Sequence, residues 1–226
     1  MGIFKKLCMT SMLGVMLAVP TYATVVTGSQ SDVNMELKYP LVYTNNMFAQ
    51  KAINTDIANY VLYAKSVYYD QHAYQVKQNY KVTYEDSQVV SILLTTYHYH
   101  AGSAHGMYNT KGLVYNKITG QRIPLYNYVK IANPQQIERG INSGILRFYS
   151  EGHKKADLLP NWNVEYVSDN YYLKGKGAIG LVYQPYELGP FSYGNTFVEF
   201  SPKAIEYFNR MNSLYMYVAI LILTVF

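Results

Sequence analysis

Residues 74–84 read YQVKQNYKVTY and residues 89–100 read VVSILLTTYHYH. In the first stretch, Tyr and Val alternate with Gln, Lys and Asn, which is the period of a half-buried antiparallel strand. The second is apolar on both faces in its first half, which favours a central strand. Glu85-Asp86-Ser87 predicts the turn between them, and residues 108–116 predict a third strand. An antiparallel sheet is therefore expected.

Two helices are expected to pack on this sheet. From residue 45 to about residue 70, apolar side chains recur at three- and four-residue spacing, with Asn45 or Asn46 as the N-cap. Asn133-Pro134 starts a second helix, whose apolar positions continue to Phe148. Further strands are expected over residues 33–43, 164–174, 177–184 and 195–200. The predicted fold class is α+β, an antiparallel sheet with two main helices packed on it.

The composition excludes several classes of protein. The chain has 226 residues, of which 50% are hydrophobic and 15% are charged, and such a chain buries a core instead of remaining disordered. No internal stretch approaches the ~18 apolar residues of a membrane span, which excludes a polytopic membrane protein. The net charge of +5 is too small to suggest nucleic-acid binding. Tyrosine is unusually frequent, at 26 residues, and favours strands and partly exposed surfaces.

The first 23 residues predict a signal peptide. Lys5 and Lys6 precede an apolar run over residues 7–19, and Thr21-Tyr22-Ala23 offers small residues at the two positions that matter for cleavage. An N-terminal anchor is the alternative, which so short an apolar run disfavours. We expect an exported protein of the periplasm or cell envelope. The single cysteine, Cys8, lies inside this segment, so the remaining chain has neither a disulfide nor thiol chemistry.

Residues 97–126 and 170–199 carry more specific motifs. The first stretch contains Gly102-Ser103-Ala104-His105-Gly106, Lys117-Ile-Thr-Gly120-Gln121 and Leu125. The second contains Pro185-Tyr186-Glu187, Gly189-Pro190, Tyr193 and Gly194. In this order and spacing the motifs resemble the RsiV-like domain family. That family occurs in anti-sigma factors that sense lysozyme, and beside the catalytic domain of PdaC-type peptidoglycan deacetylases.

The resemblance implies a division of the chain and a set of roles. Residues 24–100 would form a PdaC-accessory-like part and residues 101–212 the RsiV-like part. It implies non-catalytic binding of a lysozyme-like protein or of cell-wall glycan, without a cofactor. The binding residues would be His105, Tyr186, Glu187 and Tyr193, and the structural turns would lie at Gly102, Gly106, Gly120, Gly189, Pro190 and Gly194.

The loop chemistry suggests a contact between the two motifs. Tyr186 and Glu187 could tie their loop to the turn that holds His105, because a hydroxyl and a carboxylate both pair with an imidazole. Ser103 stands where the family has a second glycine. If that position requires positive φ, serine costs about 1 kcal/mol or more.

Two catalytic alternatives remain open. His98, His100 and His105 lie within eight residues and could bind zinc with an open fourth position. A peptidoglycan hydrolase or deacetylase could instead use paired carboxylates. The candidates are Asp157, Glu165, Asp169 and Glu187.

Two further features suggest binding surfaces. Tyrosines occur in close pairs that could stack on glycans or fill the core: Tyr68-Tyr69, Tyr97 and Tyr99, Tyr126 and Tyr128, and Tyr171-Tyr172. Residues 213–226 are almost purely apolar, which fits a shallow membrane contact, a buried terminal element or an extraneous tail.

Overall fold

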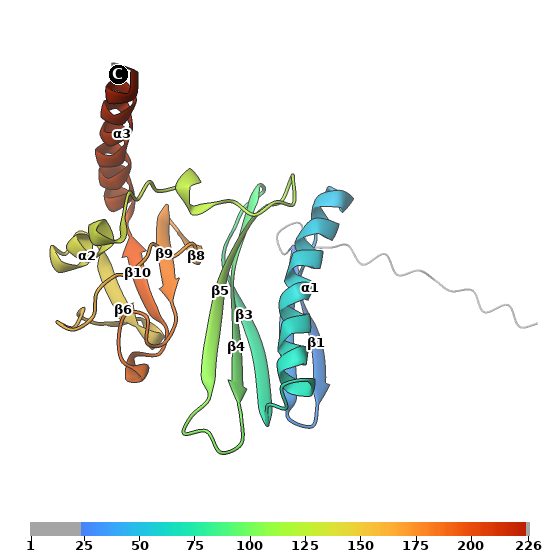
Figure 1. Ribbon diagram of the computed structural model, residues 1–226. Helices are drawn as coiled ribbons and strands as arrows, with labels where there is room; N and C mark the ends of the chain where they lie inside the picture. Colours follow the sequence, from blue (N-terminus) through green and yellow to red (C-terminus); the bar gives the residue numbers. More distant parts are fainter. Residues whose placement is uncertain (1–23, 225–226) are drawn as a thin grey trace, which may run out of the picture.

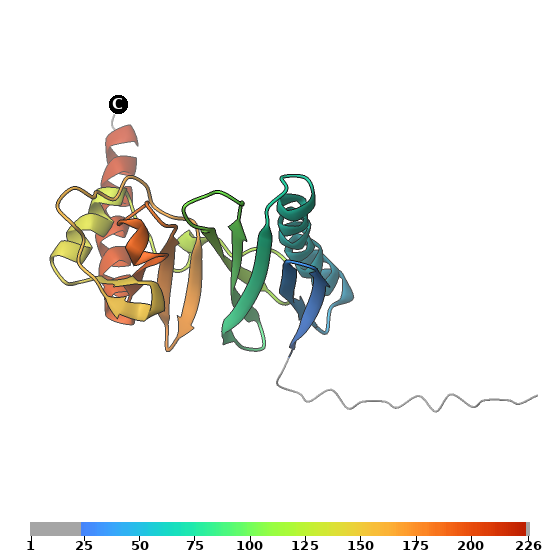
Figure 2. The same cartoon turned by 90° about the horizontal axis from the view of Figure 1, so that it is seen from below.

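The computed structural model describes residues 24–224, which form two five-stranded sheets and three α-helices (Figure 1). The predicted signal peptide lies outside the described residues. The α+β class is confirmed, with two sheets in place of the single sheet expected. Seen from below, α1 covers the outer face of the first sheet, the second sheet lies against its other face, and α2 and α3 lie beyond (Figure 2).

The first sheet has the strand order β1-β2-β3-β4-β5. Its strands are β1 (Val25–Asp32), β2 (Met35–Val42), β3 (Gln75–Glu85), β4 (Val89–Tyr99) and β5 (Met107–Asn116). Neighbouring strands are antiparallel, except that β2 and β3 run parallel. A parallel pair requires a crossover connection, and α1 (Met47–Tyr69) supplies it. The strands expected over residues 74–84, 89–100 and 108–116 are confirmed as β3, β4 and β5.

Helix α1 begins where the sequence places its cap. The Asn46 side chain accepts hydrogen bonds from the backbone N–H groups of Phe48 and Ala49. The buried stripe of the helix consists of Ala49, Ile53, Ile57, Val61, Ala64 and Val67. Ile53 and Ile57 pack against apolar residues of β4 and β5, so that burial of one helix face holds α1 on the sheet.

The second sheet has the order β7-β6-β10-β9-β8 and is antiparallel throughout. Its strands are β6 (Arg147–Ser150), β7 (Lys154–Lys155), β8 (Tyr171–Gly175), β9 (Ala178–Tyr183) and β10 (Thr196–Phe200). Helices α2 (Pro134–Asn142) and α3 (Pro202–Thr224) accompany it, with the short 3₁₀ helices η1 (Leu125–Asn127), η2 (Glu151–His153) and η3 (Phe191–Tyr193). The largest core cluster joins β5, β8, β9, β10, α2 and α3.

A glycine makes the seam between the sheets possible. A Cβ atom on Gly112 in β5 would lie 1.9 Å from the backbone oxygen of Tyr171 in β8, so only glycine allows this approach. The Leu173 N–H also donates to the Ser91 hydroxyl across the seam, at 2.9 Å. The boundary between the sheets falls after Asn116. β5 therefore completes the first sheet, although the expected division places it in the second part.

Several elements differ from those expected. The second predicted helix ends at Asn142, because Gly144 adopts φ +74° and the chain reverses into β6, where Phe148 is buried. Strand β1 and helix α3 were not predicted. α3 takes in most of the apolar tail and projects away from the sheets (Figure 1). Within residues 24–224, no helix is both long and apolar enough to cross a membrane.

Candidate functional site

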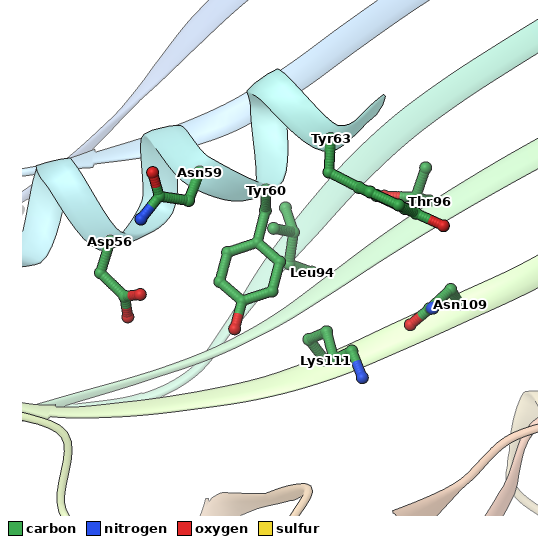
Figure 3. Close-up of a pocket in the computed structure, with 8 residues that line it drawn as sticks. All are labelled: Asp56, Asn59, Tyr60, Tyr63, Leu94, Thr96, Asn109 and Lys111. Carbon is green, nitrogen blue, oxygen red and sulfur yellow. The ribbon is translucent and has the colours of Figure 1, made fainter. Parts of the chain in front are cut away.

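A pocket of about 380 Å³ opens where α1 stands over β4 and β5 (Figure 3). Asp56 and Tyr60 project from the helix toward the strand that carries Asn109 and Lys111. The pocket is lined by Asp56, Asn59, Tyr60, Tyr63, Leu94, Thr96, Asn109 and Lys111. None of these residues belongs to the motifs that the sequence analysis singles out.

Helix α1 contributes one continuous stripe to the pocket. Asp56, Asn59, Tyr60 and Tyr63 have the spacing i, i+3, i+4 and i+7, so their side chains share one face of the helix. This stripe runs beside the buried apolar stripe. The Tyr63 side chain is 48% exposed, so part of its ring is accessible to a ligand. A polar and aromatic stripe bordering an apolar one is a signal that the sequence contains and that its analysis missed.

The sheet contributes a polar ladder across three strands. Gln78 of β3 pairs in register with Thr96 of β4, and Thr96 pairs with Asn109 of β5. The fully buried Gln78 donates from Nε2 to the Thr96 hydroxyl, at 3.0 Å. In the described part of the chain, Oε1 of Gln78 and Oδ1 of Asn109 are buried without a hydrogen-bond partner. An unpaired buried acceptor costs about 1–3 kcal/mol, which marks this ladder as a place where a ligand or water would be stabilised.

The charges of the pocket are unevenly compensated. Arg122 donates from Nε to Oδ2 of Asp56 at 2.7 Å and from Nη2 to the Tyr60 hydroxyl at 2.8 Å. The Tyr115 hydroxyl also donates to Oδ2 of Asp56, at 2.8 Å, and burial raises the pKa of Tyr115, so that it remains a donor. The half-buried Lys111 makes no side-chain hydrogen bond or ion pair with any described residue. Its ammonium is therefore an uncompensated positive charge at the pocket wall.

The two motif-bearing loops meet elsewhere. The His105 ring stacks on Phe191 with ring centroids 3.7 Å apart, and its Nε2 lies 3.3 Å from the Tyr186 hydroxyl. The predicted contact between the His105 turn and Tyr186 is therefore present. We call His105, Tyr186 and Phe191 the loop clasp. Tyr186 adopts φ +72°, a strained conformation for a residue with a side chain, and its ring is half exposed.

Other predicted binding residues have different surroundings. Glu187 does not bond to His105 as hypothesised, because Oε2 accepts from the Gln184 backbone N–H at 2.6 Å and the carboxylate also bonds to the Tyr166 hydroxyl. Tyr193 packs over Gly189 and toward Phe148, where it fills space between the loop and the sheet. Both side chains therefore brace this loop.

The motif glycines serve two different purposes. Gly102, Gly120 and Gly194 adopt φ of +90°, +78° and +60°, as turns require, and Pro190 caps η3. Gly106 and Gly189 instead lie against tyrosine rings; a Cβ on Gly106 would lie 2.3 Å from the Tyr97 ring. Ser103 is not among the residues of positive φ, so the strain considered for serine there does not arise.

Neither the zinc site nor the carboxylate pair considered from the sequence is assembled among the described residues. Among the described residues, no group of three His, Cys, Asp or Glu side chains is placed to hold a metal ion. The rings of His98 and His100 meet edge to face at 5.7 Å, whereas His105 is engaged in the loop clasp. Of the four candidate carboxylates, Asp157, Glu165 and Asp169 are exposed and Glu187 is hydrogen bonded within its loop. Of the tyrosine pairs, Tyr171 and Tyr172 are core residues.

Comparisons with known proteins give the fold and no more. No family model matches the chain, and no curated protein matches it. A crystal structure of a DUF3298 family protein from Pseudomonas aeruginosa PAO1 matches with a TM-score of 0.55 at 13% identity, over 80% of this chain and 91% of that chain. A crystal structure of a DUF3298 family member from Bacteroides fragilis NCTC 9343 matches with a TM-score of 0.49 at 13% identity, over 81% of this chain and 91% of that chain. The RsiV-like resemblance stays a prediction, and what is shown is that this chain shares the fold of a DUF3298 family protein.

Proposed function

We propose that this protein is a non-catalytic recognition module of the cell envelope that binds a saccharide in the pocket between α1 and strands β4 and β5. The observation that carries the proposal is the polar ladder beneath Tyr60 and Tyr63, in which Oδ1 of the pocket-lining Asn109 has no hydrogen-bond partner among the described residues. Binding would supply the missing donor at this atom.

A saccharide matches this pocket in both of its chemical aspects. The C–H faces of a sugar ring carry slight positive charge and pack on the negative face of a tyrosine ring. Each sugar hydroxyl both donates and accepts, so it can meet an acceptor such as Oδ1 of Asn109 beside a donor such as the Thr96 hydroxyl. The half-exposed Tyr63 and the exposed Asn59 lie at the rim, where a second sugar unit would extend.

The cell-envelope location in this proposal is based on the predicted signal peptide over residues 1–23. A cell-wall glycan is the saccharide most available to an exported protein. The RsiV-like resemblance offers a lysozyme-like protein as the alternative ligand. Such a partner is itself basic, and the chain without its predicted signal peptide has 17 basic against 14 acidic residues, a net charge of +3 that does not complement it. A concave pocket of this size is also suited to one or two sugar units.

Binding without cleavage is supported by the surroundings of Asp56, the carboxylate that lines the pocket. Its Oδ2 accepts hydrogen bonds from both Arg122 and Tyr115. Glycoside hydrolysis uses a pair of carboxyl groups that flank the scissile bond. Among the described residues that line the pocket, Asp56 is the single carboxylate, so this pair is not assembled here.

Titration calorimetry with a β-1,4-linked N-acetylglucosamine trisaccharide tests the proposal. We expect saturable one-to-one binding, weakened about tenfold by Tyr63→Ala, because one aromatic stacking contact contributes about 1.4 kcal/mol. Tyr43→Ala is the matched control, since Tyr43 is 47% exposed against 48% for Tyr63 and lies outside the pocket. Saturable binding of an animal-type lysozyme without any saccharide binding would contradict the proposal, as would equal losses in the two variants.

A further inference from the structure

We infer that the pocket selects an acidic saccharide, with the carboxylate of the sugar held by Lys111. This inference rests on the proposed saccharide binding and specifies its ligand further. It follows from the charges of the pocket wall and from the position of Lys111 on the sheet.

Counted together with Arg122, which pairs with Asp56 beside the pocket, the charges at the pocket sum to one positive unit. Asp56 is neutralised by Arg122, whose Nε lies 2.7 Å from Oδ2. Lys111 remains, half buried and without an acidic partner among the described residues. The buried Lys117 shows the opposite arrangement, since its Nζ lies 2.9 Å from Oε1 of Glu85 and also donates to the Asp86 carbonyl. A lysine in a pocket wall without such partners is available to an anionic ligand.

The register of β5 places this charge beside the polar ladder. Lys111 pairs with Leu94, and Asn109 pairs with Thr96 two residues further along the same face of the sheet. A sugar whose hydroxyl donates to Oδ1 of Asn109 would thus present its next substituent near Lys111, on the same side of the pocket (Figure 3). A carboxylate there would form a charge-assisted hydrogen bond, roughly twice as strong as a neutral one.

The experiment compares two ligands that differ in one group. N-Acetylglucosaminyl-N-acetylmuramic acid carries a lactyl carboxylate, and its carboxamide has the same shape without the charge. By titration calorimetry of the full chain in dilute buffer, we expect the acid to bind about tenfold more tightly than the carboxamide. Raising the salt concentration should shrink this ratio, because the pocket is open to solvent.

Lys111→Met should remove the preference by weakening binding of the acid far more than binding of the carboxamide. Lys77→Met is the matched control, because Lys77 is an exposed lysine that pairs with Tyr97 and lies on the other face of the sheet. Equal affinities for the two ligands, or a preference that survives in Lys111→Met, would overturn the inference and leave the saccharide function standing. If neither the acid nor the carboxamide binds, both the inference and the proposed saccharide function are overturned.

Discussion

The pocket and the loop clasp differ in how their polar groups are satisfied. In the clasp, His105 and Tyr186 bond to each other and His105 stacks on Phe191. In the pocket, Oδ1 of Asn109 and the ammonium of Lys111 have no partner among the described residues. Two of the clasp residues, His105 and Tyr186, belong to motifs quoted from the sequence, whereas the pocket residues belong to none. A motif can therefore mark a piece of architecture, and the groups available for binding can lie in an ordinary helix and ordinary strands.

The largest effect is expected at His105, where one substitution tests whether the loop clasp serves stability and not binding. His105→Ala removes the stacking on Phe191 and the bond to Tyr186, and should lower the free energy of unfolding by about 1–2 kcal/mol. For a chain of this size that corresponds to a fall in melting temperature of about 2–8 °C, measured by calorimetry. Saccharide affinity should stay the same. An unchanged melting temperature together with lost saccharide binding would reverse the roles assigned to the two regions.

Asn109→Leu should have the opposite effect, because it should weaken saccharide binding while it raises stability. The substitution keeps a similar volume and removes the unpartnered Oδ1, so the free energy of unfolding should rise by about 1 kcal/mol. The saccharide should bind several-fold more weakly because it loses an acceptor. Denaturant unfolding and titration calorimetry measure the two effects. A protein that becomes less stable while its saccharide affinity is unchanged would show that Asn109 serves the fold alone.

The smallest effect concerns pH. Burial, together with the neighbouring His100, lowers the pKa of His98, whose Nδ1 is buried without a partner among the described residues. Below the ordinary histidine pKa of about 6.5, the unfolded chain binds a proton before the folded chain does. Stability should therefore fall as the pH drops through 6.5 toward the lowered pKa of the folded state. His98→Gln should show a shallower fall in urea unfolding between pH 7.5 and 5.5, and identical slopes would refute this assignment.

The sequence predicts those parts of the fold that depend on local patterns, such as the alternation of a strand or the capping of a helix. Alternation identifies β3, a run of apolar residues identifies β4, and Asn46 caps α1 as its position suggests. The prediction for α2 extends too far, because the apolar residues up to Phe148 fit a helical spacing although Gly144 reverses the chain. The separation into two sheets depends on which strands pair, and this pairing has no signature within any one strand.

The same reasoning explains the unequal success at the two sites. His105 and Tyr186 lie in motifs that resemble the RsiV-like family, and glycines and prolines mark both loops in the sequence. Gln78, Thr96 and Asn109 lie far apart along the chain and become neighbours only through the register of three strands. Nothing in their local sequence distinguishes them from other polar strand residues, so the sheet wall of the pocket can be recognised only after the strands are paired.

Chemical-shift mapping by ¹⁵N–¹H NMR tests the central claim most directly. The N-acetylglucosamine trisaccharide would be added to the labelled protein, and the amide signals that move would locate its site. The largest shifts are expected in α1 from Asp56 to Tyr63 and around Thr96, Asn109 and Lys111, with little change at His105 and Tyr186. Shifts centred on the loop clasp, or no shifts at saturating saccharide, would contradict the account.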